Sequence, residues 1–343
     1  MGKIAKIFAI TIASTLLLGI ALIAAGLSLG GKLNWNVKIG DSYNISNSYM
    51  ISQGSGEIVE GEEKFDNFDE IETSTSSLKV YVNKGDEYKV KYHTYEENKP
   101  EIKVENNILY VKQNTDGKIG IFINNDEDEY VIITVKDENK EYKVDFELTS
   151  GDLNVENIAI DGSLNLTSGN VAFKNLTMNN LDVKMTSGEY LIDNVTANDL
   201  TISLSSGNVT IKNYKGENVI INETSGDVKL SDVVINDLDF KASSGSFVSS
   251  NLETKSFKTD ITSGDVKVEK LTAESVDCNG KSGSTKIELV GDVTDYNYDL
   301  DKTSGNISYN DIKVDDHIVI DNKATKNVTG KITSGALKIS FTK

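Results

Sequence analysis

Arginine is absent from this chain, and cysteine, histidine and proline are almost absent. All 35 basic residues are lysines, set against 53 acidic residues, so the formal net charge is −18. Nucleic-acid binders need clustered positive charge, and arginine supplies their bidentate contacts to phosphate and guanine. The composition therefore predicts no nucleic-acid partner, and the acidity disfavours adsorption to an anionic membrane surface.

The scarcity of cysteine and histidine limits the chemistry further. Cys278 is the single cysteine, so no intramolecular disulfide can form. His93 and His317 lie far apart in the sequence, which excludes by count a zinc site of the usual Cys/His type. The single proline, Pro100, fits an ordered strand-rich chain better than a proline-rich stalk.

One long apolar run lies near the N-terminus. Residues 7–31 carry no charge, and as a helix they would span roughly 37 Å, enough to cross a bilayer. Because lysines precede the run, we predict a transmembrane anchor with residues 1–6 in the cytoplasm and the body outside. A cleaved signal peptide, with Ser28-Leu29-Gly30 as its cleavage site, is the alternative. Both interpretations export the body, and the first makes it a single-pass cell-membrane protein with the lipid bilayer as a partner.

Residues 32–56 are rich in Asn, Ser and Gly and show no sustained period. We interpret them as a spacer and expect them to be poorly ordered.

A tripeptide ending in glycine recurs through the rest of the chain. It reads Thr-Ser-Gly or a close variant, and successive glycines are 18, 19, 19, 19, 19, 19, 19, 22 and 30 residues apart. These glycines are Gly151, Gly169, Gly188, Gly207, Gly226, Gly245, Gly264, Gly283, Gly305 and Gly335. A spacing held this tightly is a structural period.

Each repeat is predicted to contain three short strands and three corners. The second and fourth residues after the glycine are apolar, as in Val228 and Leu230, which is the pattern of a strand with one inward face. The sixth residue is Asn or Asp in six repeats, and these residues tolerate the left-handed conformation of a sharp bend. A second polar corner and another strand then lead to the next triplet, whose glycine permits a positive φ.

A repeat of this length cannot bury its inner face alone. Stacking each strand in parallel on its counterpart one repeat later, at ~4.7–4.9 Å, solves this problem and aligns identical side chains in columns. We therefore predict an all-β fold, with a single parallel β-solenoid (β-helix) over residues 149–343 whose ~19-residue coils stack in chain order. A right-handed coil is favoured. The alternative is a β-sandwich, but its strands do not share one turn tripeptide at a locked interval.

Residues 57–148 alternate apolar and polar residues without the triplet. We predict an irregular β region that caps the solenoid, because an open parallel edge invites aggregation. Asn106-Asn107 is expected to turn a hairpin. Val144, Phe146 and Leu148 already fit the inward columns of the third strand.

The ordered set of segments EKFDNFDEIETSTSSLKVYVNKGDEYKVKY, IKVENNILYVK and VIITVKDENKEYKVDFELTSGDLNV, followed by TSGDVKL-type strands, resembles a known family. It is similar to the bacterial "putative adhesin" domain family of unknown function, over about residues 57–343. Such proteins commonly have a proline where Val135-Lys136 stands here. The resemblance implies a β-helix-like fold, membrane anchoring in a Gram-positive bacterium, a surface role and, for some members, a link to envelope-stress systems.

An acidic stretch has the spacing of a calcium-binding loop. Asp295, Asn297, Asp299 and Asp301 alternate along it, but the glycine that an EF-hand loop requires is missing. The apolar residues between them, such as Tyr296 and Tyr298, favour instead a strand with an acidic outer face.

Other chemistry-bearing residues receive structural interpretations. His93 and His317 are expected to be exposed strand residues, and Cys278 a core residue in the same column as Phe240. The many serines have no histidine nearby to activate them. We therefore predict no catalytic, cofactor-binding or metal-binding residue and no cofactor.

Glu223 is the one acid in a column of otherwise apolar residues. Because a buried carboxylate without a partner is costly, we expect this column to lie near a corner and to stay partly wet there.

The predicted function is that of a non-enzymatic surface protein. Its long polar faces would bind or scaffold an unknown protein or polysaccharide at the cell envelope, in the manner of an adhesin or as an accessory to an envelope-stress response. The alternative is a polysaccharide-acting β-helix lyase or hydrolase, which needs a groove with clustered acids and a strong base such as the missing arginine.

Overall fold

The computed structural model describes residues 33–39, 43–49, 57–113, 129–137 and 139–343. It divides into two compact units, and the first contains an antiparallel pair formed by β1 (Leu33–Ile39) and β2 (Tyr43–Tyr49). These two strands lie within the range interpreted as a spacer. The predicted anchor, residues 7–31, lies outside the described residues. Within the described part of the chain, no helix has the length and hydrophobicity needed to cross a bilayer.

The second unit consists almost entirely of β-strands. Its N-terminal strands are β3 (Ile58–Phe65), β4 (Glu70–Thr75), β5 (Lys79–Lys84), β6 (Tyr88–Tyr95), β7 (Pro100–Glu105), β8 (Ile108–Gln113) and β9 (Tyr130–Val135). The short helix η1 (Glu96–Asn98) follows β6 in sequence, and Tyr95–Glu97 belong to the first unit. The central strands are β10 (Glu141–Ser150), β11 (Leu153–Glu156), β12 (Ala159–Val234), β13 (Asp237–Ala242), β14 (Ser246–Glu253), β15 (Ser256–Thr272) and β16 (Ser275–Val290). The C-terminal elements are η2 (Val293–Asp295), β17 (Tyr296–Lys302), β18 (Asn306–Tyr309), β19 (Ile312–Val314), β20 (His317–Ile320), β21 (Lys326–Ile332) and β22 (Ala336–Thr342).

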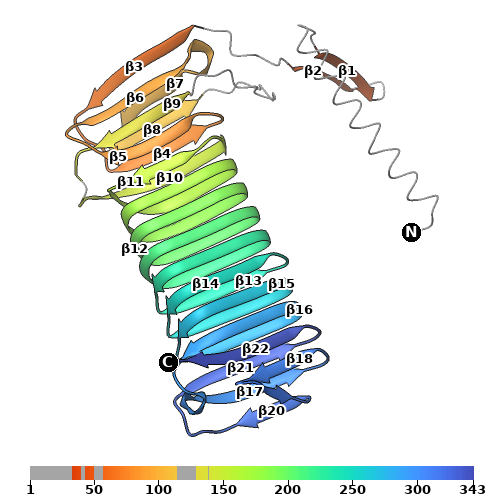
Figure 1. Cartoon of the computed structure of the whole chain (residues 1–343). Coiled ribbons are helices and arrows are strands. Elements are labelled where there is room, and N and C mark those ends of the chain that lie inside the picture. Colours follow the sequence, from red (N-terminus) through yellow and green to blue (C-terminus); the bar gives the residue numbers. More distant parts are fainter. Residues whose placement is uncertain (1–32, 40–42, 50–56, 114–128, 138) are drawn as a thin grey trace. The chain divides into compact units, whose positions relative to one another are not determined.

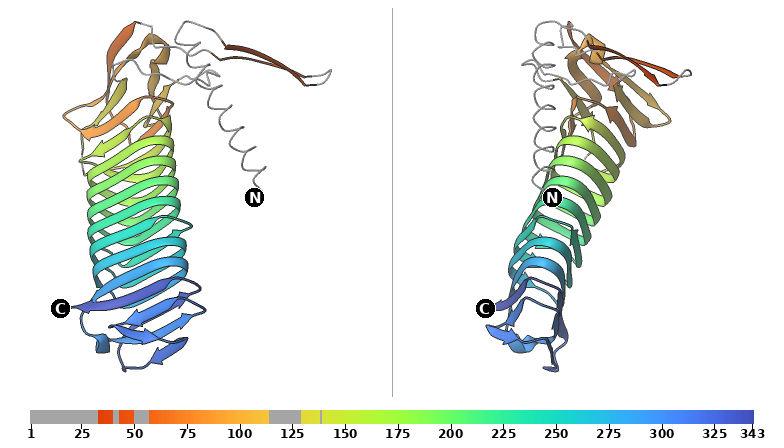
Figure 2. Two further views of the ribbon diagram at one scale, coloured as in Figure 1. Left: turned by 45° about the vertical axis from the view of Figure 1, so that its right-hand side comes forward. Right: turned by 90° about the vertical axis from the view of Figure 1, so that its right-hand side faces the viewer.

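Successive repeats stack as parallel coils, as the period predicts (Figures 1 and 2). Strand pairing joins residues 19 apart, for example Val228 with Phe247 and Phe247 with Val266. The glycines form a column so tight that a Cβ on Gly226 would lie 1.8 Å from the carbonyl oxygen of Gly207. No larger residue fits there, which explains why the triplet ends in glycine.

The first corner also follows the prediction. All six Asn or Asp residues at the sixth position have positive φ, from 50° at Asn213 to 60° at Asn157. The seventh repeat places Lys270 there with φ 54°. The next repeat has lost this residue, and the register between β15 and β16 shifts between Val268 and Leu271.

Polar ladders run along the corners and fasten coil to coil. Asn194 donates to Asn175 at 2.7 Å, and Asn175 donates to Asn157 at 3.1 Å. At the second corner Asn180 pairs with Asp161 and Asn218 with Asp199. Amides therefore alternate with acids in that column, so that carboxylates are not stacked directly on one another at ~4.8 Å.

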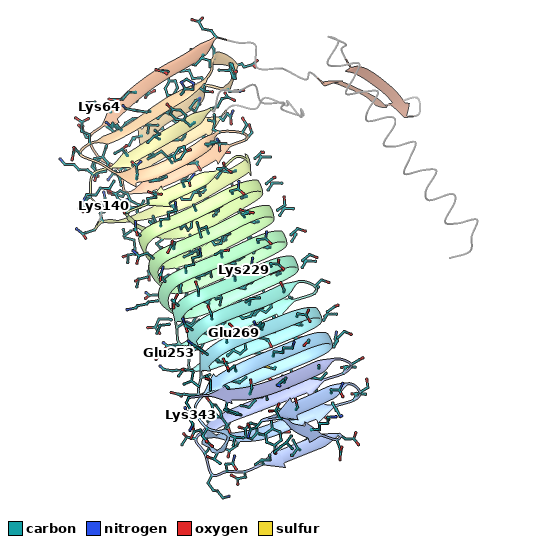
Figure 3. All side chains as sticks on the ribbon, in the orientation of Figure 1. Lys64, Lys140, Lys229, Glu253, Glu269 and Lys343 are labelled. Atoms are coloured by element: carbon teal, nitrogen blue, oxygen red, sulfur yellow. The ribbon has the colours of Figure 1, made fainter. Side chains whose placement is uncertain are left out.

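The inward columns form one continuous apolar core. Alternate residues of each strand are buried, including Phe173, Ile192, Phe240 and Phe247, as the period-two pattern predicts. Val144, Phe146 and Leu148 of β10 occupy the predicted columns, paired with residues 162, 164 and 166. Charged side chains such as Lys229 and Glu253 are exposed on the outside of the coils (Figure 3).

The prediction that coils stack in chain order is wrong at the C-terminal end. There β21 and β22 pair with β16 on one side and with β17 and β18 on the other. The last coil of the sequence, β21 and β22, thus lies between β16 and the coil of β17 and β18. As a result, Gly335 rather than Gly305 stacks on Gly283. The intervals of 22 and 30 residues supply the extra length that this crossing requires.

The N-terminal end shows the same exchange. β10 and β11 stack on β4 and β5, and these in turn stack on β8 and β9. The outermost coil, β8 and β9, therefore comes later in the sequence than the coil beneath it, β4 and β5. β7 and β8 form the expected hairpin, with positive φ at Asn106 (52°) and Asn107 (64°).

Antiparallel strands cover the exposed edges at both ends. At the N-terminal end β7 pairs with β8, β6 pairs with β9, and β3 pairs with β6. At the C-terminal end β19 pairs with β18 and β20 with β17. The parallel ladder is thus finished by hairpin-like additions rather than left open.

Candidate functional site: a trough along the stacked third strands

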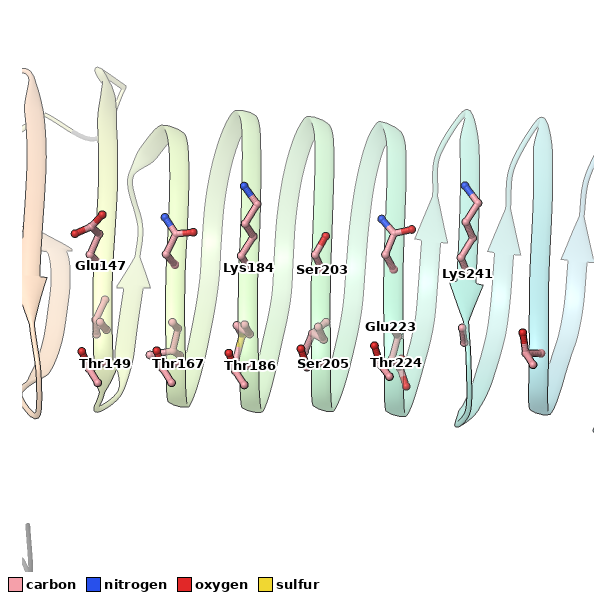
Figure 4. A pocket seen from close by; sticks show the side chains of 18 of the residues that line it. Glu147, Thr149, Thr167, Lys184, Thr186, Ser203, Ser205, Glu223, Thr224 and Lys241 are labelled. Carbon is pink, nitrogen blue, oxygen red and sulfur yellow. The ribbon is translucent and has the colours of Figure 1, made fainter. Parts of the chain in front are cut away.

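A trough of about 860 Å³ follows the stack axis across the outer face of the third strands. It extends from Ser74 and Thr75 on β4 to Thr262 on β15 and Lys281 on β16. Its form follows from the repeat, because each coil contributes the same positions relative to its glycine. Figure 4 shows the two parallel rows of side chains that bound it.

The lower row, two residues before each glycine, consists of small hydroxyl side chains. In the trough they are Thr149, Thr167, Thr186, Ser205, Thr224 and Thr262. The upper row, four residues before each glycine, is more varied and consists of Glu147, Asn165, Lys184, Ser203, Asn222, Lys241 and Asp260. Within each row neighbours are one strand spacing apart, ~4.8 Å. The trough therefore offers a linear array of hydrogen-bonding groups.

Both lysines of the upper row form ion pairs. Lys184 pairs with Asp182 at 3.0 Å, and Lys241 pairs with Asp239 at 2.8 Å. Each lysine thus pairs with the acid two residues earlier on the same strand. That acid is the next outward-facing residue on the side away from the lower row. This leaves the hydroxyl row itself uncharged between Thr149 and Thr262.

The residues three before each glycine form the floor, and one of them is Glu223. Its side chain is only 6% exposed, and neither carboxylate oxygen has a hydrogen-bond partner in the described part of the chain. It stacks on Ala242, whose small side chain leaves room for it. A Cβ on Gly245 would come within 2.7 Å of Glu223 Oε1, so the carboxylate lies against the glycine column.

The expectation that Glu223 stays partly wet is wrong, although its column is the predicted one. Burial, together with the nearby Asp227 carboxylate, raises the pKa of Glu223 from its usual 4.5 to about 7. The cost of a buried charge is reduced because the group takes up a proton instead.

The residues with calcium-loop spacing do not converge. Asp295 accepts a bond from the backbone N–H of Asp292, Asn297 bonds Asn327 and Ala324, and Asp299 lies 2.9 Å from His317. Among the described residues no group of three or more His, Cys, Asp or Glu side chains could hold a metal ion. Tyr296, Tyr298 and Leu300 are buried, which confirms the interpretation as a strand with an acidic outer face.

The two histidines differ in environment. His317 is exposed, as expected, whereas His93 is half-buried. The His93 ring stacks on Tyr130, and its Nδ1 lies 2.9 Å from Glu60.

Cys278 confirms its interpretation as a core residue. It is 1% exposed and follows Phe240 and Thr259 in one column. Burial raises the pKa of its thiol to about 12, so the thiolate that nucleophilic chemistry needs is not available near neutral pH.

The lower row is the first residue of the repeated Thr-Ser-Gly triplet, which predicts a corner and a long polar face but not a trough. A signal was present: the residues two before the glycines from Gly151 to Gly264 are all Thr or Ser. A corner of this kind does not require a hydroxyl at that outward position. The repeated Thr or Ser therefore indicates a property of the surface and not a requirement of core packing.

The family model Toastrack DUF4097 matches residues 68–247 and 192–343. The chain therefore belongs to this family, whose function is not known. No curated protein matches the chain.

Similar solved structures include three bacterial proteins. A protein described as a "putative adhesin" from Bacteroides fragilis NCTC 9343 has 13% identity over 83% of this chain and 98% of that chain, with a TM-score of 0.41. One described as a "putative lipid binding protein" from Parabacteroides distasonis ATCC 8503 has 17% identity over 84% and 98%, with a TM-score of 0.44. One described as a "putative cell adhesion protein" from Clostridium sporogenes ATCC 15579 has 15% identity over 83% and 100%, with a TM-score of 0.26. At these identities and scores the likeness carries no argument about ligands.

Proposed function

We propose that this protein is a non-enzymatic, adhesin-like surface protein that holds an extended partner in the trough. Residues 7–31 would tether it to the cell membrane, with the stack outside the cell. An accessory role in envelope stress belongs to the same proposal and rests on the family resemblance alone.

The observation that carries the proposal is the hydroxyl row from Thr149 to Thr262. It repeats one kind of hydrogen-bonding group at ~4.8 Å over several coils. A linear partner, such as a polysaccharide chain or an extended peptide, can meet such an array along its length, whereas a compact substrate would use only one or two coils. The shallow, repeated contacts suit binding and do not by themselves assemble a general acid, a general base and a nucleophile.

The test compares two matched variants. Ser203 and Thr210 are both half-buried hydroxyl residues that face outward, but only Ser203 lies in the trough. Binding of the purified protein to cell-envelope polysaccharides, including anionic glycans with and without Ca²⁺, is measured for Ser203→Arg and Thr210→Arg. Ser203→Arg is expected to weaken binding at least about tenfold, since a bulky side chain crosses the trough and costs more than ~1.4 kcal/mol.

Thr210→Arg is expected to bind as the parent does. Turnover of any glycan by the parent protein would contradict the non-enzymatic part and favour the lyase or hydrolase alternative. Equal binding by both variants would show that the trough is not the binding face.

A further inference from the structure

The two ends of the stack expose different kinds of edge. At the N-terminal end the outer strands are β3, which contains Glu60, Glu62, Glu63 and Lys64, and β7, which contains Pro100, Glu101, Lys103 and Glu105. Charges and prolines on edge strands block pairing with another chain. At the C-terminal end β19 has a central lysine, Lys313. β20 reads His-Ile-Val-Ile and has no such protection.

The apolar surface at the C-terminal end is also unusually exposed. Val319 on β20 is 64% exposed and Ile312 on β19 is 51% exposed, the two highest values among the exposed large hydrophobic residues of the described chain. Ile318 and Ile320, on the other face of β20, are only half-buried although they pack against the core. A strand added beside β20 would cover all three of these β20 side chains.

The hydrogen-bonding pattern shows which groups of β20 are available. Lys302 N–H donates to the Asp316 carbonyl at 2.9 Å, and the register places Asp301 opposite His317 and Asp299 opposite Val319. In an antiparallel pair, bonded and non-bonded residues alternate. The even-numbered residues of β20 therefore bond β17, and the backbone groups of His317 and Val319 point outward, where the described strand pairings give them no partner.

We propose that β20 pairs antiparallel with β20 of a second copy, across a twofold axis that passes beside Val319. Only registers that face odd-numbered residues with odd-numbered residues match the outward groups. Placing Val319 opposite its own counterpart sets His317 opposite Asp321 of the second copy, the residue that follows β20. A shift of two residues in one direction sets Asp315 against Asp321 of the second copy, and a shift in the other direction removes His317 from Asp321 of the second copy.

The register centred on Val319 is favoured because it keeps Asp315 and Asp321, the acids on either side of β20, from facing each other across the pair. It also places Ile318 beside Ile320 of the second copy, twice by symmetry, so that the two cores become continuous. The partner is a second copy of this chain, and the edge that it uses lies at the end of the stack away from β3 (Figures 1 and 2).

The experiment traps the pair with a disulfide in the full chain, held in mild detergent so that the apolar run at 7–31 does not drive association. In the proposed register the two Val319 Cα atoms are ~5.5 Å apart, within the range of a disulfide. Val319→Cys should therefore form a covalent dimer under mild oxidation. Val234→Cys is the matched control, because Val234 is an exposed valine (42%) on a regular coil far from β20 in sequence. The native Cys278 is buried in both proteins.

A second pair of variants tests the register. In the Val319→Cys background, His317→Lys places a positive charge opposite Asp321 of the second copy, whereas His317→Asp sets two acids against each other. The first should give about tenfold more dimer than the second, which corresponds to ~1.4 kcal/mol for two symmetry-related pairs. Unfolding curves that match the parent's show that the variants are folded.

If folded Val319→Cys forms no more dimer than Val234→Cys, self-pairing at β20 is overturned. If it dimerises but the two His317 variants do not differ, the proposed register is overturned.

Discussion

The regular coils and the two ends provide hydrogen-bonding partners for their strands in different ways. In the regular coils every strand lies between two parallel neighbours, so each backbone demand repeats: glycine at the third corner and a left-handed Asn or Asp at the first. At the ends the parallel partner is missing, and the chain exchanges the order of two coils and adds antiparallel strands. The repeated residues thus determine the structure of the regular coils, whereas the residues of individual strands determine how each end is covered.

The same exchange at both ends has a physical consequence. In each case the coil nearest the chain terminus, β4–β5 or β21–β22, lies inside the coil that is next to it in sequence. The coil nearest the terminus therefore cannot unravel one strand at a time, because another coil covers it. Fraying, which is common at open ends of repeat arrays, is reduced without a separate capping domain.

The largest expected effect comes from the glycine column of the regular coils. Gly226→Ala combines φ 145° with a Cβ 1.8 Å from a backbone oxygen, so it should lower the free energy of unfolding by about 3–5 kcal/mol. Gly280→Ala, at the edge of the regular region, meets only the flexible tip of Ile332 at 3.1 Å and should change it by less than about 1 kcal/mol. Guanidinium unfolding measures both. Equal effects would remove the distinction between the two regions.

Glu223 is an irregularity inside the regular coils, and its effect depends on pH. Its pKa in the folded protein, about 7, lies above the usual 4.5, so the folded state holds the proton more tightly. The contribution of Glu223 to stability should therefore be greatest below about pH 4.5 and be lost as the pH rises from 4.5 to 7, by at most about 3 kcal/mol.

Glu223→Leu, which restores the apolar column, should make the protein about 3 kcal/mol more stable at pH 8 and remove this pH dependence. Thermal unfolding between pH 4.5 and 8 measures it. Glu147→Gln, at an exposed acid of the upper row, is the control and should change stability at pH 8 by less than about 0.5 kcal/mol. A Glu223→Leu protein that keeps the slope would show that another group causes it.

The first corner allows a comparison between the middle and the last regular coil. Asn194→Ala loses a residue suited to φ 57° and the ladder bond to Asn175, so it should cost about 2 kcal/mol. Lys270→Asn, at the same corner with φ 54°, should instead stabilise by about 1 kcal/mol. Matched denaturation curves test this pair. A loss of stability in Lys270→Asn would mean that its lysine has a role that the corner does not explain.

The smallest effect on stability, but a clear one on association, is expected at the edges. Val319→Lys copies the protection of the N-terminal edge and should change stability by less than about 0.5 kcal/mol while abolishing self-association. The reverse change, Glu101→Thr with Lys103→Thr on β7, should create weak association at the other end. Sedimentation velocity detects both, and association that persists in Val319→Lys would place the contact elsewhere.

The sequence predicted the repeated part of the fold because each coil states its own requirements locally. Gly226, Asp232 and the alternation of Val228 with Leu230 define strand, corner and column without reference to distant residues. The exchange of coils could not be predicted in this way, because Gly305 and Gly335 end the same triplet and either could stack on Gly283. The longer intervals around them were a signal of irregularity, but not of its form.

The candidate site was only partly accessible to sequence reasoning. The alternation showed that Thr186 and Ser203 face outward, but not that their two rows bound a trough. Glu223 was placed in the right column, yet its burial was missed, because the room left by Ala242 and the closeness of the glycine column are properties of packing between coils.

The most direct test of the account concerns the order of coils at the C-terminal end. Lys286 pairs with Lys338, and Lys338 lies opposite Ser308 on the other side. With cysteines at two positions, Lys286→Cys/Lys338→Cys should form a disulfide readily, since the Cα atoms are ~4.8 Å apart. Lys286→Cys/Ser308→Cys, two strand spacings apart, should not. Coils stacked in chain order would give the opposite result, and that result would contradict the architecture described for this end.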